Sequence, residues 1–153
     1  MSGRSLLLVT VLTSITTGCI LPTLQPAAAP TMPEEAAARD ALVRFASTLD
    51  AEYLPVAPNP LLGNSLPEVK GCTLEFVGRA ALAQRHAGER TAPMILAVTV
   101  QPPAQDGTLT VLVSLEASVL VGFEEWPNGQ GCEYVYQPTA DGAEFVREQG
   151  WVE

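Results

Sequence analysis

LTVLVSLEASVLVGF, residues 109–123, is the clearest strand pattern in the chain, because apolar side chains occupy every second position from Leu109 to Phe123. Side chains of a β-strand point alternately to the two faces of its sheet, so this period of two predicts a strand with one buried face. At about 3.3 Å per residue the run would span roughly 50 Å, which exceeds the width of a small domain. We therefore expect the strand to bend near Ala117-Ser118 or at Gly122, where the side chains are small.

Shorter strands are expected on both sides of this run. Residues 94–100 alternate in the same way, and the turn-forming stretch PPAQDG (102–107) separates them from the long run. Asn128-Gly129 and Asp141-Gly142 mark two further turns, because both dipeptides favour tight connections between strands. The expected meander therefore starts with a strand from about residue 72, in which Leu74, Phe76, Ala80 and Leu82 alternate, and continues with antiparallel strands at 94–100, 109–123, 132–138 and 143–147.

A helical pattern precedes these strands and should run from residue 34 to about Ala51. Leu42, Phe45 and Leu49 recur at the spacing that places side chains on one face of a helix. Thr31-Met32-Pro33-Glu34 has the form of a capping box, which predicts a helix start at this point. The sequence therefore predicts an α+β fold, in which an N-terminal amphipathic helix packs on a curved antiparallel β-sheet.

Two segments between the helix and residue 94 are less regular. Residues 53–71 contain four prolines and two glycines, and are expected to form an irregular connection. Within it, Leu61-Leu62 could cover a pocket or close one end of the core. Residues 79–89 fit two structures, because their apolar positions continue the alternation of 74–76 while their alanine content suits a helix nearly as well.

The order of these elements, one helix followed by a strongly curved antiparallel sheet, resembles the cystatin and NTF2-like architectures over about residues 34–147. The resemblance implies a sheet that wraps around the helix. An NTF2-like member would also imply a pocket between helix and sheet, for a small ligand or for simple acid–base chemistry.

Residues 1–18 have the parts of a bacterial export signal, with Arg4 in a short cationic segment and the apolar run LLLVTVL at 6–12. The apolar stretch is shorter than the roughly 20 residues that a membrane-spanning helix needs. Thr16-Thr17-Gly18-Cys19 resembles the lipobox of bacterial lipoproteins, although Thr16 stands where the family usually has Leu. This resemblance implies cleavage before Cys19, lipidation of its thiol and a membrane-anchored place in the cell envelope. The alternative is ordinary secretion, with cleavage at a nearby small residue.

Residues 19–33 (CILPTLQPAAAPTMP) form a Pro/Ala-rich tether without charges, which leaves 34–153 as a single globular α+β domain. Hydrophobic residues make up 47% of the chain, enough for a packed core. The chain holds 17 Asp+Glu against 8 Lys+Arg, a net charge of −9. An acidic surface repels phosphate backbones, so we expect no nucleic-acid partner. The expected partners are the membrane, through the lipid anchor, and an unidentified envelope protein.

Lipidation of Cys19 would leave Cys72 and Cys132 as an even pair. Export to an oxidising compartment predicts a disulfide between them. In a strict meander, however, these two cysteines open the first and fourth strands and lie at opposite ends of the sheet. The bridge therefore conflicts with the simple meander unless residues 79–89 are not a strand.

Residues suited to catalysis are few. His86 is the only histidine, and we interpret it as an exposed residue of a polar turn. Glu124-Glu125, with Glu116 and Glu133, form the densest acidic cluster, which we interpret as a solvated strand end because no calcium-loop motif is present. No CxxC or HxxxH motif occurs. We therefore predict no catalytic residue, no metal site, no cofactor and no enzymatic activity.

Three functions remain: a non-enzymatic binding or assembly module, an NTF2-like pocket protein, and an acidic inhibitor of a cationic secreted enzyme. We favour the first, because polar residues that could perform catalysis are scarce. The predicted interaction surface is Phe123, Glu124, Glu125 and Trp126, since aromatic residues are favoured in protein interfaces.

Overall fold

The computed structural model describes residues 32–152. The predicted signal peptide 1–18, Cys19 and all of the tether except Met32 and Pro33 lie outside the described residues. The described part has the predicted α+β fold, in which a long helix packs on an open sheet.

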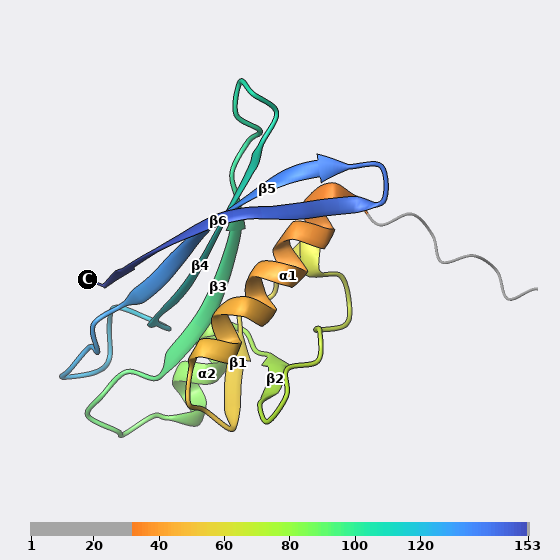
Figure 1. The fold of residues 1–153 in the computed structure, drawn as a ribbon. Coiled ribbons are helices and arrows are strands. Elements are labelled where there is room, and N and C mark those ends of the chain that lie inside the picture. The colour runs from red at the N-terminus through yellow and green to blue at the C-terminus, as the bar shows by residue number, and fades with distance from the viewer. Residues whose placement is uncertain (1–31, 153) are drawn as a thin grey trace, which may run out of the picture.

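The sheet has six strands and two helices flank it (Figure 1). Its strands lie side by side in the order β2-β1-β3-β4-β5-β6. Along the chain the elements are α1 (Pro33–Thr48), β1 (Tyr53–Val56), the 3₁₀ helix η1 (Pro60–Leu62), β2 (Thr73–Phe76), α2 (Arg79–Arg85), β3 (Met94–Val100), β4 (Leu109–Ala117), β5 (Gln130–Thr139) and β6 (Gly142–Val152).

The predicted meander is confirmed for four of the strands and wrong for the other two. Strands β3 to β6 each pair antiparallel with the next strand in sequence. Strand β1 instead pairs parallel with both β2 and β3, so the sheet is mixed. Parallel neighbours need a long crossover connection. The proline-rich segment after β1 and helix α2 after β2 supply these connections.

Helix α1 starts one residue before the predicted range and ends at Thr48, before the expected end at about Ala51. Its N-cap is Met32, which makes no side-chain capping bond, so the predicted capping box is wrong. Pro33 at the first helical position suits a helix start because its fixed φ is already helical and no N–H is lost there. The buried face consists of Ala37, Ala38, Ala41, Leu42, Phe45 and Ala46.

This face of α1 and the sheet form the main core. Leu42 is fully buried, Phe45 nearly so, and half-buried Leu49 packs at the edge of the same cluster. The sheet contributes alternate residues of β3, β4 and β5, among them Val98, Val113 and Tyr134. The layer between helix and sheet is therefore filled with apolar side chains.

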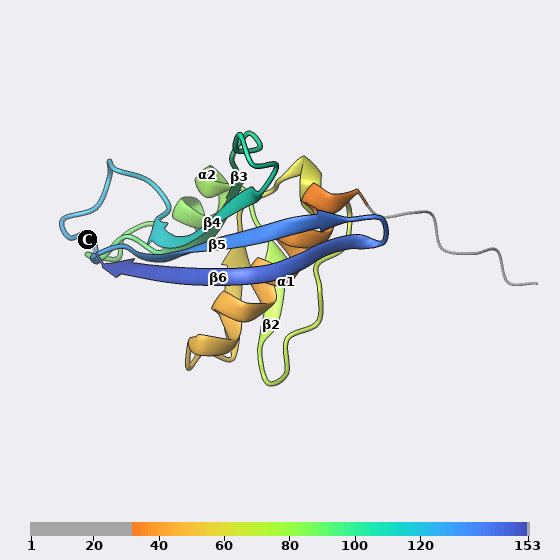
Figure 2. The ribbon, with the colours of Figure 1, turned by 45° about the horizontal axis from the view of Figure 1, so that its top comes forward.

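A smaller core lies on the opposite face of the sheet, beneath α2. Val77 and Leu82 pack there against Ile95, whose neighbour Leu96 points into the main core. Figure 2 shows α1 and α2 on opposite sides of the sheet. The open question about residues 79–89 is thus settled as a helix over Arg79–Arg85 followed by a turn.

The segment 53–71 is more ordered than expected. It begins with strand β1 and contains η1, so the prediction of a wholly irregular connection is wrong. Leu62 is fully buried in the main core and therefore closes one end of it. The Asn59 side-chain amide donates to the Val98 carbonyl at 2.6 Å and fixes this segment to β3.

Strand β4 is shorter than the 109–123 pattern suggested. It ends at Ala117, and the chain turns away instead of continuing as a bent strand. Ser118 is buried, and Gly122 adopts a positive φ of 90°, a conformation that suits glycine. The predicted interruption near Ala117-Ser118 is therefore correct but ends the strand instead of bending it, and Gly122 lies in the loop that follows.

Cys72 and Cys132 are both free thiols, so the predicted disulfide is wrong. Cys132 is buried in β5, and Cys72 directly precedes β2 at the edge of the sheet. Strands β1, β3 and β4 lie between β2 and β5. At about 4.8 Å per strand, this separation far exceeds the Cα distance that a disulfide spans.

One polar cluster joins α1 to β5 and β6. The buried Tyr136 hydroxyl donates to Asp40 Oδ2 at 2.8 Å, and Arg44 Nε donates to the same oxygen at 2.6 Å. The Arg44 guanidinium lies 3.9 Å from the centre of the Phe145 ring, which meets Tyr136 edge-on at 5.9 Å. Burial, followed by the bond to Asp40, raises the pKa of Tyr136.

We predict that Tyr136→Phe lowers the free energy of unfolding by about 1–2 kcal/mol at neutral pH, because a hydrogen bond to a carboxylate is lost while the ring stays packed. The raised pKa means that the folded protein keeps the phenol proton longer than the unfolded chain does. The contribution of Tyr136 to the free energy of unfolding is therefore complete below about pH 10 and is lost as pH rises further.

Urea unfolding at neutral pH and at about pH 11 measures both effects. The wild type should lose more stability between the two conditions than Tyr136→Phe does. Equal stability of Tyr136→Phe and wild type at neutral pH would contradict this role.

Candidate functional site

The loop that joins β4 to β5, residues 118–129, carries two highly exposed aliphatic side chains near its start. Leu120 is 79% exposed and Val121 is 77% exposed, and Trp126 farther along the loop is 47% exposed. Large apolar side chains that remain in water gain free energy when a partner covers them. We call residues 118–129 the β4–β5 loop and treat it as the candidate binding site.

The β4–β5 loop is fixed to the segment before β3. Arg90 Nε donates to Glu124 Oε2 at 2.9 Å, and Arg90 Nη2 donates to Glu125 Oε1 at 3.0 Å. The Thr91 hydroxyl donates to Glu125 Oε2 at 3.1 Å. The Arg90 carbonyl accepts from both glutamate N–H groups, and Ala92 N–H donates to the Glu125 carbonyl. These bonds hold in one conformation the part of the loop that follows its apolar residues.

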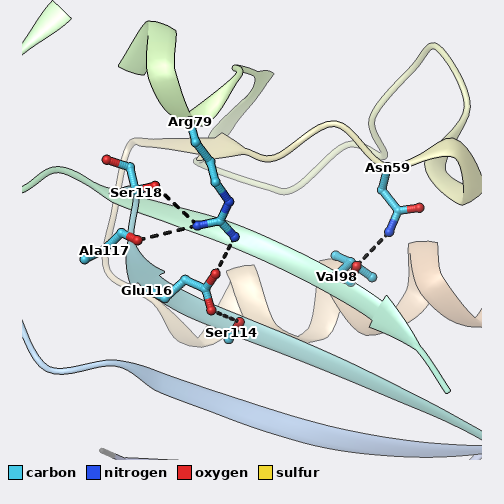
Figure 3. Close-up of polar contacts among 7 residues, drawn as sticks. All are labelled: Asn59, Arg79, Val98, Ser114, Glu116, Ala117 and Ser118. Carbon is cyan, nitrogen blue, oxygen red and sulfur yellow. Dashed lines mark hydrogen bonds and ion pairs between the residues drawn. The ribbon is translucent and has the colours of Figure 1, made fainter. Parts of the chain in front are cut away.

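A second set of bonds fixes the start of the loop (Figure 3). Arg79, at the start of α2, forms an ion pair with Glu116 and reaches the carbonyls of Ala117 and Ser118 at 3.5 Å each. The Ser114 hydroxyl donates to the other carboxylate oxygen of Glu116 at 3.0 Å. These contacts fix the start of the loop to α2, which lies on the face of the sheet opposite to α1.

The predicted interaction surface lies within this loop, but its residues differ in role. Trp126 is exposed and available to a partner, whereas Phe123 is half-buried. Glu124 and Glu125 are exposed carboxylates that pair with Arg90 and so position the loop.

Leu120 and Val121 were missed, because the period-two pattern assigned this stretch to the long strand. Val119, Leu120 and Val121 are three successive apolar residues, which breaks strict alternation and could have signalled the loop.

The acidic cluster expected from the sequence does not form. Glu116 pairs with Arg79, Glu124 and Glu125 pair with Arg90, and Glu133 lies 3.8 Å from Arg147. The four carboxylates are thus divided among three guanidinium groups and do not gather into one oxygen site for a cation. Within residues 32–152, no group of three His, Cys, Asp or Glu side chains is placed to hold a metal ion.

His86 is half-buried at the C-terminus of α2, so the expectation of a fully exposed turn residue is only partly correct. Its Nδ1 lies 2.9 Å from Glu89 Oε1, and both residues line a cleft of about 340 Å³ together with Tyr53. The Tyr53 hydroxyl bonds to Glu75, and this bond is the main cause of the lowered pKa of Glu75. The cleft contains no cysteine or serine that His86 could activate.

Two larger clefts border the sheet edges. One of about 890 Å³ lies against β2 and includes Cys72, whose pKa is raised by burial. A raised pKa keeps this thiol protonated and makes it a weaker nucleophile. The other cleft, of about 470 Å³, lies beside the end of α1 and contains Glu148 as its only carboxylate.

We predict that Arg90→Gln loosens the β4–β5 loop without unfolding the domain. Exposed ion pairs contribute little to global stability, about 0–1 kcal/mol, so the urea midpoint should change little. Amide hydrogen exchange in residues 119–127 should become several-fold faster, because the side-chain bonds to Glu124 and Glu125 are lost. Arg85→Gln, which removes an exposed ion pair with Glu75, is the control. Unchanged exchange in the loop of Arg90→Gln would show that the backbone bonds alone hold it.

No helix among residues 32–152 combines the length and the apolar character needed to cross a bilayer. Comparison with known proteins gives no relative: no family model, no curated protein and no solved structure matches this chain. The functional argument therefore rests on the β4–β5 loop and on the way in which Arg79 and Arg90 hold it.

Proposed function

We propose that this chain is a lipid-anchored, non-enzymatic module of the cell envelope that binds a partner protein through the β4–β5 loop. The observation that carries the proposal is the exposure of Leu120 and Val121 on a loop that ion pairs hold in place. A loop that is ordered before binding loses less conformational entropy when a partner covers it.

The position of the loop relative to the proposed anchor supports this function. The start of α1 lies beside the β5–β6 turn, where a Cβ on Gly142 would come within 3.2 Å of Ala36. The β4–β5 loop lies at the other end of β5, about 30 Å away for ten extended residues (Figure 1). A lipid on Cys19 would therefore tether the end of the domain opposite to the loop and leave Leu120 free to meet a partner.

The loop chemistry indicates the kind of partner. Its apolar residues lie next to two carboxylates that share one guanidinium, so this part of the surface keeps a negative charge. A partner that fits would offer an apolar pocket with basic residues at its rim. The acidic-inhibitor hypothesis uses the same surface and differs only in making the partner an enzyme.

The filled helix–sheet layer disfavours the NTF2-like alternative. Leu42, Phe45 and Tyr134 occupy the space in which a pocket protein would hold its ligand. The three clefts described above lie at the edges of the sheet or beside α2, and they lack an aligned nucleophile and base.

The double variant Leu120→Asp/Val121→Asp should weaken partner binding at least about tenfold, because it places two charges in the apolar contact. Chemical cross-linking in intact envelopes, followed by quantitative recovery of the tagged full chain, measures the loss. Ala104→Asp/Gln105→Asp, which adds the same charges to the exposed turn between β3 and β4, is the matched control. Equal recovery of partner with both double variants would reject the loop as the binding site.

The lipid anchor has its own test. The expected mass of the mature wild-type N-terminus is that of an acylated Cys19, and Cys19→Ser should lack the acyl groups and leave the membrane fraction after high-salt washing. A Cys19→Ser chain that stays in the membrane fraction like the wild type would contradict the anchor without bearing on the β4–β5 loop.

A further inference from the structure

We infer that β6 is the pairing edge for a second copy of this chain, which adds its own β6 antiparallel and joins two sheets into one. Strand β6 is the longest strand, Gly142–Val152, and pairs with β5 along one edge. No strand among residues 32–152 pairs with its other edge, and the sheet is open. This inference concerns a different surface from the β4–β5 loop and does not depend on it.

The C-terminal half of β6 lacks three of the features with which proteins usually protect a sheet edge, although it carries the charges of Arg147 and Glu148. Such edges are commonly short, contain proline, or are covered by a helix or loop. The opposite edge, β2, has only four residues, whereas β6 has eleven and no proline. Helix α1 runs away from the C-terminal half of β6 toward the end of the sheet that holds β1, as both ribbon views show (Figures 1 and 2). The backbone of residues 147–152 is therefore open to another strand.

The irregularity in β6 limits where a second copy can pair. The register with β5 shifts between Val135 and Tyr136, whose partners are Arg147 and Phe145, so Val146 is the extra residue. A bulge bends a strand and interrupts regular pairing. The regular part of the edge is thus 147–152, and an axis near its middle gives the longest overlap.

Charge selects among the symmetric registers. When a two-fold axis relates two antiparallel copies of β6, one residue lies directly opposite the same residue of the other copy. An axis between two residues is excluded, because it would set side chains from different faces of the sheet opposite each other. An axis at Arg147 or at Glu148 sets like charges against each other, and like charges directly opposite are unfavourable. Axes at Gln149 and at Gly150 both avoid this, and of the two only the axis at Gln149 includes Arg147 within the regular edge, where it lies opposite Trp151. Its opposing pairs within the regular edge are Gln149 with Gln149, Glu148 with Gly150 and Arg147 with Trp151.

The pairs in this register suit the exposed side chains. Gly150 would leave room opposite Glu148. The fold of a single copy does not require a glycine there, because Gly150 has no positive φ and a Cβ would meet only the Gly131 carbonyl oxygen at 3.6 Å.

Two substitutions at this one position test the inference. Gly150→Lys should tighten the dimer and Gly150→Glu should weaken it, because the new side chain faces Glu148 of the other copy twice per dimer. Cross-strand charge pairs of this kind correspond to changes of roughly twofold to thirtyfold in the dissociation constant. Light scattering of the full chain in detergent over a concentration series measures the protein mass, and circular dichroism checks that both variants fold.

Gln149→Cys gives an independent readout, since its thiol would face its own copy across the axis. Oxidation in intact envelopes should then trap a disulfide-linked dimer, whereas Gln137→Cys, an exposed position of β5, should not. A wild-type chain that stays monomeric at all concentrations, or a dimer that both Gly150 variants weaken equally, would overturn the inference.

Discussion

The packing of α1 across the sheet is the constraint on which the rest of this structure depends. Four alanines on its buried face, Ala37, Ala38, Ala41 and Ala46, are fully buried and let the helix approach the strands closely. Leu42 and Phe45 then fill the layer between them. The Tyr136–Asp40 hydrogen bond fixes the helix to β5 in one orientation, because a buried hydroxyl must keep its partner.

This packing places the surfaces available to partners at the perimeter of the domain. The helix covers one face of the sheet, and α2 covers part of the other face through Leu82 and Ile95. The β4–β5 loop and the C-terminal half of β6 remain, and both lie at the same end because Gln130, which follows the loop, pairs with Val152. That end is remote from the start of α1. A module that is tethered through the start of α1 could therefore bind a partner and a second copy at the same time.

The sequence predicted those parts of the fold that local periodicity determines. The helical spacing of Leu42 and Phe45 identified the buried face of α1, and the alternation of 109–117 identified β4. The parallel pairing of β1 could not be predicted, because strand direction depends on a crossover through residues 57–72 that carries no periodic signal. For the same reason, the separation of Cys72 from Cys132 was visible only once the strand order was known.

The candidate site was predicted in part. Trp126 was identified because a tryptophan suits an interface, but Leu120 and Val121 were assigned to the long strand, with Val121 on its buried face. Their exposure results from the end of β4 at Ala117, where the ion pair of Arg79 with Glu116 and its contacts with two carbonyls hold the chain. Arg79 and Glu116 lie 37 residues apart in sequence, and no local pattern marks such a contact.

The most direct test of a filled interior with binding at the perimeter is hydrogen–deuterium exchange of the full chain, in native envelopes and after purification. We predict that protection differs only in residues 118–127 and 146–152, while the amides of α1 and β3 exchange alike in both samples. Altered protection along α1 and the strands beneath it, without change in the loop or in β6, would contradict this account. It would show that a ligand enters between helix and sheet.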